Sequence, residues 1–472
     1  MVHGCRKAYP GARPTAPSRL RAPRIAPLSR PPDAPATVTS ATYCAIDFGT
    51  SNSAVAVPDG AAMRLIELEP GFRTMPTAVF YPGDGGRRGQ AAPCEFGRAA
   101  IAAYVDGIDG RLMRSMKSIL GSSLVEQTTD VGGGRGVRFL DIVATYLRHL
   151  KKCAEAAAGA PVDRAVVGRP VYFVDDDAER DAQAEAALRS AAASAGFREI
   201  VFQYEPIAAA FDHEQAVTRE EKVLVADIGG GTSDFSLVRV GPERTGRVDR
   251  KADILANHGV HVAGTDFDRR IELASILPLF GYGAYGPSID GAPPREVPSA
   301  VYFDLATWHL INTVYNPQRV VELRGMRSFY ADAAQHRRLM TVLTEHFGHD
   351  LVARAEAAKI AVAGGGRATI DLGHVEAGLA SVLDEAEAAR SLDADLDRIV
   401  AAARTTVAQA GAAAGAVDAL YLTGGSTGLD SLSERLRAAF PGARLVRGDR
   451  FASVATGLAL FAQRRFAGPG RR

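Results

Sequence analysis

The chain has 472 residues, of which 47% are hydrophobic and 23% are charged, and its formal net charge is +1. A chain of this length can bury a large core and is expected to form at least two domains. The charge gives no electrostatic reason to expect a nucleic-acid partner, and no apolar run reaches the roughly 18 residues that a membrane span requires. The four cysteines lie far apart and form no Cys-x-x-Cys pair, which favours a reduced, cytoplasmic setting.

Residues 1–40 differ in composition from the rest of the chain. They hold eight prolines, and seven lysines and arginines against one acidic residue, Asp33. Such a segment buries too little apolar surface to offset its ordering entropy, so we expect a disordered tail. An arginine-rich, acid-poor arm would also suit targeting or an anionic partner, but its prolines disfavour the amphipathic helix of a transit peptide. A passive tail or a mis-assigned start codon is therefore the preferred interpretation.

The next predicted element is a hairpin over residues 43–57. Its first strand ends at Asp47, and its turn is Gly49-Thr50-Ser51. Four alternating elements follow further along: a helix over 137–158, a strand over 162–168, an alanine-rich helix over 176–195 and a strand over 199–203. The last strand leads to Glu205, and Pro206 suits the first position of a helix, where its missing N–H costs nothing. A glutamate before a proline is commonly only a helix cap.

A glycine-rich hairpin over residues 223–238 organises the whole chain. Its first strand ends at Asp227, its turn is Gly229-Gly230-Gly231-Thr232, and Asp234 opens the second strand. Successive glycines let main-chain N–H groups converge into an anion cradle, and carboxylates beside such a cradle suit Mg²⁺. Asp47 begins the same arrangement 180 residues before Asp227. Two such turns predict a duplicated fold that holds a nucleotide between two lobes.

Residues 280–318 are rich in glycine, proline and aromatic residues and contain Trp308. They predict an insertion in the second lobe. A locally packed Ω-loop is the favoured form, and a partner-binding surface around Trp308 is the alternative.

The last predicted elements carry a second glycine turn. A helix over 349–363 bears Glu356 and Lys359 at i, i+3, a spacing typical of a surface ion pair. A strand over 419–423 leads into Gly424-Gly425-Ser426 before a helix, whose N-terminus favours an anion or a ribose hydroxyl. A final helix over 453–466 is expected to cross back onto the first lobe.

These motifs, in this order, resemble the actin-like ATPase superfamily. The Glu205-Pro206 pair before an alanine run, Gly-Gly-Gly-Thr at 229–232 and Gly-Gly-Ser-Thr at 424–427 look most like the heat shock protein 70 family, over residues 43 to about 465. The resemblance implies an α/β fold of duplicated RNase H-like lobes with the nucleotide cleft between them. The expected domains are the tail (1–40), lobe one (41–220), lobe two (221–452) and the C-terminal helix (453–466).

The resemblance also implies ligands and residue roles. ATP would bind with Mg²⁺, which Asp47 and Asp227 would hold through water. The nucleotide-binding residues would be Gly49, Thr50, Ser51, Gly229, Gly230, Gly231, Thr232, Gly264, Glu356, Lys359, Gly424, Gly425 and Ser426. The catalytic residues would be Lys117, Glu205, Thr232 and Asp234. Lys117 matches the family's lysine that reaches toward the terminal phosphate, and either Glu205 or Asp234 would accept the proton of the attacking water.

Two departures from the family affect the expected activity. The arginines that sandwich adenine are replaced by Ile360 and Gly428, and the serine that bonds the base is replaced by Ala363. Losing two cation–π contacts predicts roughly 10- to 10³-fold weaker binding and less discrimination between ATP and GTP. No linker and peptide-gripping β-sandwich follow residue 465, so we expect no tight binding of extended hydrophobic peptides.

Several classes of function remain open at this point. The favoured one is a slow, chaperone-like ATPase that acts as a nucleotide-dependent switch, with a protein client or co-chaperone and with neither nucleic acid nor membrane as partner. A sugar-type kinase would need a further carboxylate base, which we do not find, and an actin-like filament protein would need self-complementary faces. A catalytically inactive nucleotide sensor is the fourth class. No zinc-protease, nucleophile-elbow or Walker motif occurs.

Overall fold

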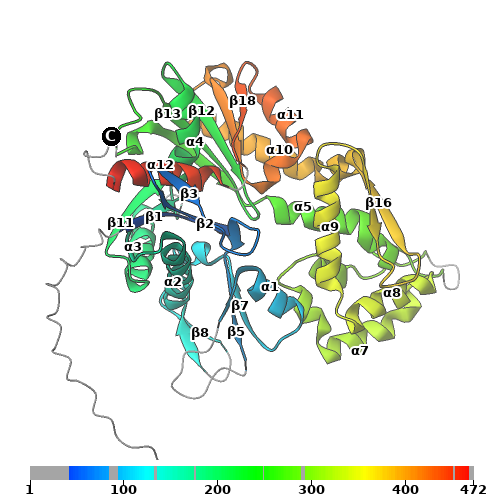
Figure 1. The fold of residues 1–472 in the computed structure, drawn as a ribbon. Helices are drawn as coiled ribbons and strands as arrows, with labels where there is room; N and C mark the ends of the chain where they lie inside the picture. The colour runs from blue at the N-terminus through cyan, green and yellow to red at the C-terminus, as the bar shows by residue number, and fades with distance from the viewer. Residues whose placement is uncertain are drawn as a thin grey trace, which may run out of the picture. The chain divides into compact units, whose positions relative to one another are not determined.

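The structure is a computed structural model. It describes residues 42–83, 94–131, 135–174, 177–247, 249–288, 293–449 and 452–466, so the predicted tail over 1–40 lies outside the described residues. The described chain is a mixed α/β structure (Figure 1). None of its helices is both long and apolar enough to cross a membrane.

The first large sheet has the strand order β11-β10-β1-β2-β3, and β4 also pairs with β2. Its strands are β1 (Thr42–Phe48), β2 (Asn52–Asp59), β3 (Ala62–Leu65), β4 (Thr74–Pro76), β10 (Val162–Arg169) and β11 (Glu199–Tyr204). The central strand β1 runs antiparallel to β2 and parallel to β10. We call the elements around this sheet lobe one.

The second large sheet has the order β14-β13-β12-β17-β18. Its strands are β12 (Glu221–Ile228), β13 (Ser233–Val240), β14 (Ile254–Val260), β17 (Ala419–Thr423) and β18 (Arg444–Arg447). The central strand β12 runs antiparallel to β13 and parallel to β17, which repeats the arrangement around β1. We call the elements around this sheet lobe two. The repeat places the two predicted hairpins at equivalent positions of two sheets, as expected for a duplicated fold.

Twelve α-helices are present in the described ranges. They are α1 (Gly97–Val105), α2 (Phe139–Ala158), α3 (Ala178–Ser194), α4 (Glu205–Ala216), α5 (Gly264–Ile271), α6 (Ala300–Leu305), α7 (Pro317–Gly325), α8 (Ala333–Thr344), α9 (Gly348–Val362), α10 (Glu385–Gln409), α11 (Asp430–Ala439) and α12 (Ser453–Phe466). The predicted helices over 137–158, 176–195 and 349–363 are confirmed as α2, α3 and α9. Their apolar residues recur at helical spacing and are buried, as Ile142, Tyr146 and Leu150 of α2 show.

Smaller sheets complete the two lobes. Lobe one adds β5 (Ala78–Pro82), β6 (Glu95–Phe96) and β7 (Gly110–Arg114) in one sheet, and β8 (Thr128–Asp130) and β9 (Gly136–Arg138) in another. Lobe two adds the pair β15 (Arg367–Asp371) and β16 (Ala380–Asp384). The strand β7 leads into the segment that contains the candidate site residue Lys117.

A buried apolar cluster joins the two large sheets through α4 and α12. It combines Ala45 and Val166 of the first sheet with Val225 of the second. Gly457 of α12 crosses α4 so closely that a Cβ would lie 1.8 Å from the carbonyl oxygen of Ala208. Only glycine permits this approach, so α12 packs directly on α4 within the apolar cluster that joins the two sheets.

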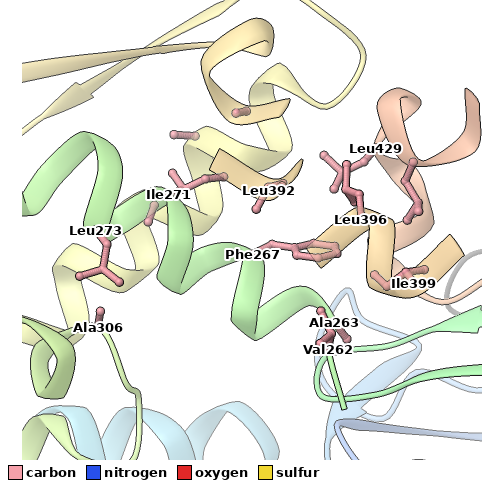
Figure 2. Close-up of a cluster of buried hydrophobic side chains, with 14 of the residues drawn as sticks. Val262, Ala263, Phe267, Ile271, Leu273, Ala306, Leu392, Leu396, Ile399 and Leu429 are labelled. Carbon is pink, nitrogen blue, oxygen red and sulfur yellow. The ribbon is translucent and has the colours of Figure 1, made fainter. Parts of the chain in front are cut away.

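The core of lobe two fixes the start of α5. Figure 2 shows Phe267 and Ile271 of α5 against Leu392 and Leu396 of α10, and all four side chains are buried. Burying aromatic and aliphatic side chains of this size contributes about 1.5–3 kcal/mol each. The packing therefore holds the N-terminus of α5, where Gly264 lies, in one position relative to the sheet.

The prediction of an Ω-loop over 280–318 is wrong for the part of this segment that the structure describes. The segment contains α6 and a 3₁₀ turn over Ile311–Tyr315. Its residues Tyr302, Leu305 and Val314 belong to the core of lobe two. Glycine and proline are poor helix formers, so the composition of this stretch did not predict its short apolar helix. Tertiary packing stabilises that helix.

Candidate functional site

The turns of the two hairpins meet in space. A Cβ on Gly230 would lie 2.6 Å from the hydroxyl oxygen of Ser51, so the β12–β13 turn contacts the β1–β2 turn that contains Gly49 and Thr50. The start of α5 joins them, because Gly264 N–H donates to the Gly229 carbonyl at 3.2 Å. Three predicted nucleotide-binding segments are thus brought together.

The third glycine turn lies at the same place. The Ser426 hydroxyl donates to the Gly229 carbonyl at 2.9 Å. Gly424 has φ +88°, and a Cβ there would lie 2.4 Å from the Ile228 carbonyl oxygen and 2.7 Å from Oδ1 of Asp227. A side chain at this position would therefore clash with the backbone and with the carboxylate. Gly425 begins the 3₁₀ turn that follows.

Asp47 and Asp227 stand at equivalent ends of β1 and β12, and both are half-buried. Burial raises the pKa of Asp47 to about 8, and the negative charge of Glu205 adds to this shift while Lys117 opposes it. Burial likewise raises the pKa of Asp227 to about 7, with the charge of Asp234 as the next cause. Burial and the neighbouring negative charges therefore keep both carboxyl groups partly protonated near neutral pH.

Lys117 and Glu205 form an ion pair, although 88 residues separate them. Their side chains are only 9% and 15% exposed, so neither charge is well solvated. Lys117 lies in a 3₁₀ turn that follows Ser115, whose φ of 53° is in the left-handed region. Residues held in such conformations often mark functional sites. The sequence pattern did not reveal this pairing.

Thr232 and Asp234 lie at the other side of the β12–β13 turn. The Thr232 hydroxyl donates to Oδ2 of Asp234 at 2.8 Å. Asp234 is exposed and is paired in register with Asp227. Gly231, between the two strands, has open space around its Cβ position. The turn thus presents an acidic group and a hydroxyl toward solvent beside the half-buried carboxylate of Asp227.

Glu356 and Lys359 do not form the surface ion pair that is typical of their i, i+3 spacing. The Lys359 ammonium instead lies 2.6 Å from Oδ1 of Asp268 on α5 and donates to the Gly264 carbonyl at 3.4 Å. Lys359 is buried, whereas Glu356 is exposed. Burial raises the pKa of Asp268 to about 6, and Lys359 opposes the shift. Lys359 therefore connects α9 to the first turn of α5, a contact that the i, i+3 spacing could not predict.

The base-binding positions implied by the resemblance lie where α9 meets the segment after Gly425. Asp430 N–H donates to the carbonyl of Ala363 at 3.0 Å, two residues after Gly428. The Ile360 side chain is 64% exposed. An apolar side chain and a glycine thus occupy the two positions at which the resemblance implies guanidinium groups.

These residues fit a nucleotide bound with a divalent cation. A Cβ atom at Gly49, Gly230, Gly264 or Gly424 would clash with neighbouring atoms, so side chains are excluded from these positions. Glycine-rich turns of this kind can present backbone N–H groups to phosphate. The charged groups that shift the pKa values of Asp47 and Asp227 are carboxylates and one ammonium group. The carboxylates are Asp227, which acts on Asp47, together with Asp234 and Glu205, and the ammonium group is Lys117. Within the described ranges no three His, Cys, Asp or Glu side chains are placed to bind a metal ion directly.

The duplicated sheets and the glycine turns between them define the actin-like ATPase fold. Residues 43–275 match the family model described as Hsp70 protein. The chaperone protein dnaK of Cyanophora paradoxa is 32% identical over 246 residues, which are 48% of this chain and 36% of that protein. Residues 43–275 are therefore similar to the Hsp70 family, and the match spans about a third of the length of this relative.

Proposed function

We propose that this protein binds ATP with Mg²⁺ and hydrolyses it slowly, as a nucleotide-dependent switch between the two lobes. The observation that carries the proposal is the meeting of two glycine turns beside Asp47 and Asp227, with the Lys117–Glu205 pair next to them. A protein client or co-chaperone is the proposed partner, by analogy with the chaperone to which the chain is similar.

In this proposal the residues act mainly by position and charge, as is usual in phosphoryl transfer. Asp47 and Asp227 would hold Mg²⁺ through water, and the ion would neutralise charge on the terminal phosphates. Lys117 would stabilise the charge that builds on the transferred group. Glu205, Thr232 and Asp234 would orient the attacking water, and the glycine turns, with Thr50, Ser51 and Gly264, would cradle the phosphates.

A phosphate-release assay tests the proposal. Purified protein is incubated with Mg·ATP alone, with an unfolded protein, and with a set of candidate sugars. We expect slow release without any addition, no sugar dependence, and a change of rate on adding an unfolded protein. Release or ADP formation that requires a sugar would favour a kinase instead, and ATP-dependent sedimentation of the protein would favour a filament. The absence of Mg·ATP binding by calorimetry would overturn the proposal.

The base-binding positions give a separate prediction. Replacing Ile360 with arginine should tighten ATP binding, because a guanidinium group would regain one cation–π contact of about 0.5–2 kcal/mol, which is roughly 2- to 30-fold in affinity. Ile360 is exposed, so the longer side chain does not have to enter a packed core. Titration calorimetry with ATP and GTP measures the change, and I360K and I360M are the matched controls for charge and size. A wild-type protein with nanomolar affinity and strong preference for ATP would contradict the assignment of Ile360 to the base.

A further inference from the structure

Aromatic side chains from the two lobes stack on one another away from α12. Tyr104 of α1, in lobe one, stacks on Trp308 of lobe two with ring centroids 5.3 Å apart and an interplanar angle of 25°. His349 of α9 lies 4.9 Å from the Trp308 ring and meets the Tyr104 ring edge-on at 5.6 Å.

A guanidinium group completes this cluster. Arg114, the last residue of β7, lies with its central carbon 4.1 Å from the centroid of the Trp308 ring. Burial lowers the pKa of Arg114, and the charge of Glu356 opposes the shift. The Trp308 ring thus has Arg114 and Tyr104, both from lobe one, as neighbours.

The histidine in the cluster is neutral and hydrogen-bonded. His349 is 5% exposed, and burial, together with the positive charge of Arg114, lowers its pKa to about 4. Its Nε2 lies 3.2 Å from Oδ1 of Asn312, and the Asn312 side chain also hydrogen-bonds the Tyr104 hydroxyl. Asn312 of lobe two therefore hydrogen-bonds both His349 and Tyr104 of the cluster.

The elements that carry this cluster also carry residues of the nucleotide site. Arg114 lies three residues before Lys117, and His349 shares α9 with Glu356 and Lys359. If the lobes separate about the buried cluster at α4 and α12, the distance between β7 and α9 must increase. Such a movement would break the Arg114–Trp308 and Tyr104–Trp308 contacts, while the apolar cluster around α12 stays closed.

We propose that Tyr104, Arg114, Trp308 and His349 form a clasp that holds the two lobes together over the nucleotide site and sets the rate at which nucleotide leaves. This inference rests on the proposed nucleotide binding. In the clasp Trp308 contacts Tyr104 and Arg114 of its own chain. This assignment replaces the partner-binding surface around Trp308 that the sequence left as an alternative.

Trp308 is the single tryptophan of the sequence, so its fluorescence reports on the clasp without labelling. In the protein without nucleotide, Tyr104→Ala should increase acrylamide quenching of Trp308, because the stacked ring that covers it is removed. Tyr172→Ala is the matched control, because Tyr172 is 51% exposed on lobe one and outside the cluster. Equal quenching in the Tyr104→Ala variant, the control and the wild type would overturn the contact and with it the clasp.

The release rate is measured in the same variants by displacing a fluorescent ADP analogue. We expect Tyr104→Ala and Trp308→Ala each to speed dissociation by about 2- to 10-fold, the factor that one aromatic pair contributes, with little change in the association rate. Tyr104→Phe, which keeps the stack, should release like the wild type. Unchanged release in Tyr104→Ala, with nucleotide bound by the wild type, overturns the clasp alone. If the wild type binds no nucleotide, the proposed function fails, and the role in release fails with it.

Discussion

Replacing Lys117 with alanine should lower the single-turnover rate of ATP hydrolysis by about 10²-fold or more. In the proposed mechanism the positive charge of this side chain acts where negative charge builds during phosphoryl transfer, so its loss should affect the rate more than the binding of ATP. The ion pair with Glu205 holds Lys117 in a poorly solvated place. Rapid-quench measurement of one turnover, with binding followed by calorimetry, separates the two effects.

The pairing with Glu205 requires a control for stability. Removing Lys117 leaves the Glu205 carboxylate without its partner, and an unpaired buried charge costs roughly 3–5 kcal/mol. The double variant Lys117→Ala/Glu205→Gln removes this cost and should fold more stably while remaining slow. Lys151→Ala is the matched control, because Lys151 is also a weakly exposed lysine in an ion pair, with Glu155 on α2. A wild-type rate in folded Lys117→Ala protein would remove this residue from the mechanism.

Replacing Asp227 with asparagine should weaken Mg·ATP binding by roughly 10- to 100-fold, the effect typical of losing a group that orients a metal site. The same change should leave the free energy of unfolding of the nucleotide-free protein unchanged or increase it. The reason is that Asp227 is crowded by the charges of Asp234 and Glu205, and a neutral amide relieves this repulsion. Calorimetric titration and denaturant unfolding measure the two effects, with exposed Asp106→Asn of lobe one as control. Equal Mg·ATP affinity in variant and wild type would contradict the assignment.

The raised pKa values add a dependence on pH to this prediction. The folded-state pKa is about 8 for Asp47 and about 7 for Asp227, whereas an aspartate in an unfolded chain titrates near 3.9. Between these values the folded protein without nucleotide holds more protons than the unfolded chain, so its stability should fall as the pH rises from about 4 and should level off above about 8. In the proposed site Mg·ATP binding needs the ionised carboxylates, so the affinity should rise as the pH approaches 8. The Asp227→Asn variant should show a shallower dependence.

The sequence by itself determined the two hairpins, the glycine turns and the neighbouring carboxylates. These features are local: an apolar run that ends in Asp47 or Asp227, followed by glycines, specifies a buried strand and a tight turn within about ten residues. Apolar periodicity likewise determined helices such as α2 and α9. The same order of motifs was enough to predict the duplicated fold, because each motif recurs at an equivalent place in its own sheet.

Only the tertiary structure decided which distant side chains meet. The pairing of Lys117 with Glu205, the attachment of Lys359 to Asp268 and the stacking of Trp308 on Tyr104 join residues that lie 88 or more positions apart. No periodicity encodes such contacts, since each depends on how whole lobes pack. A buried charge takes the nearest opposite charge that packing offers rather than the nearest one in sequence. For that reason Lys359 binds α5, and not Glu356 one turn away on its own helix.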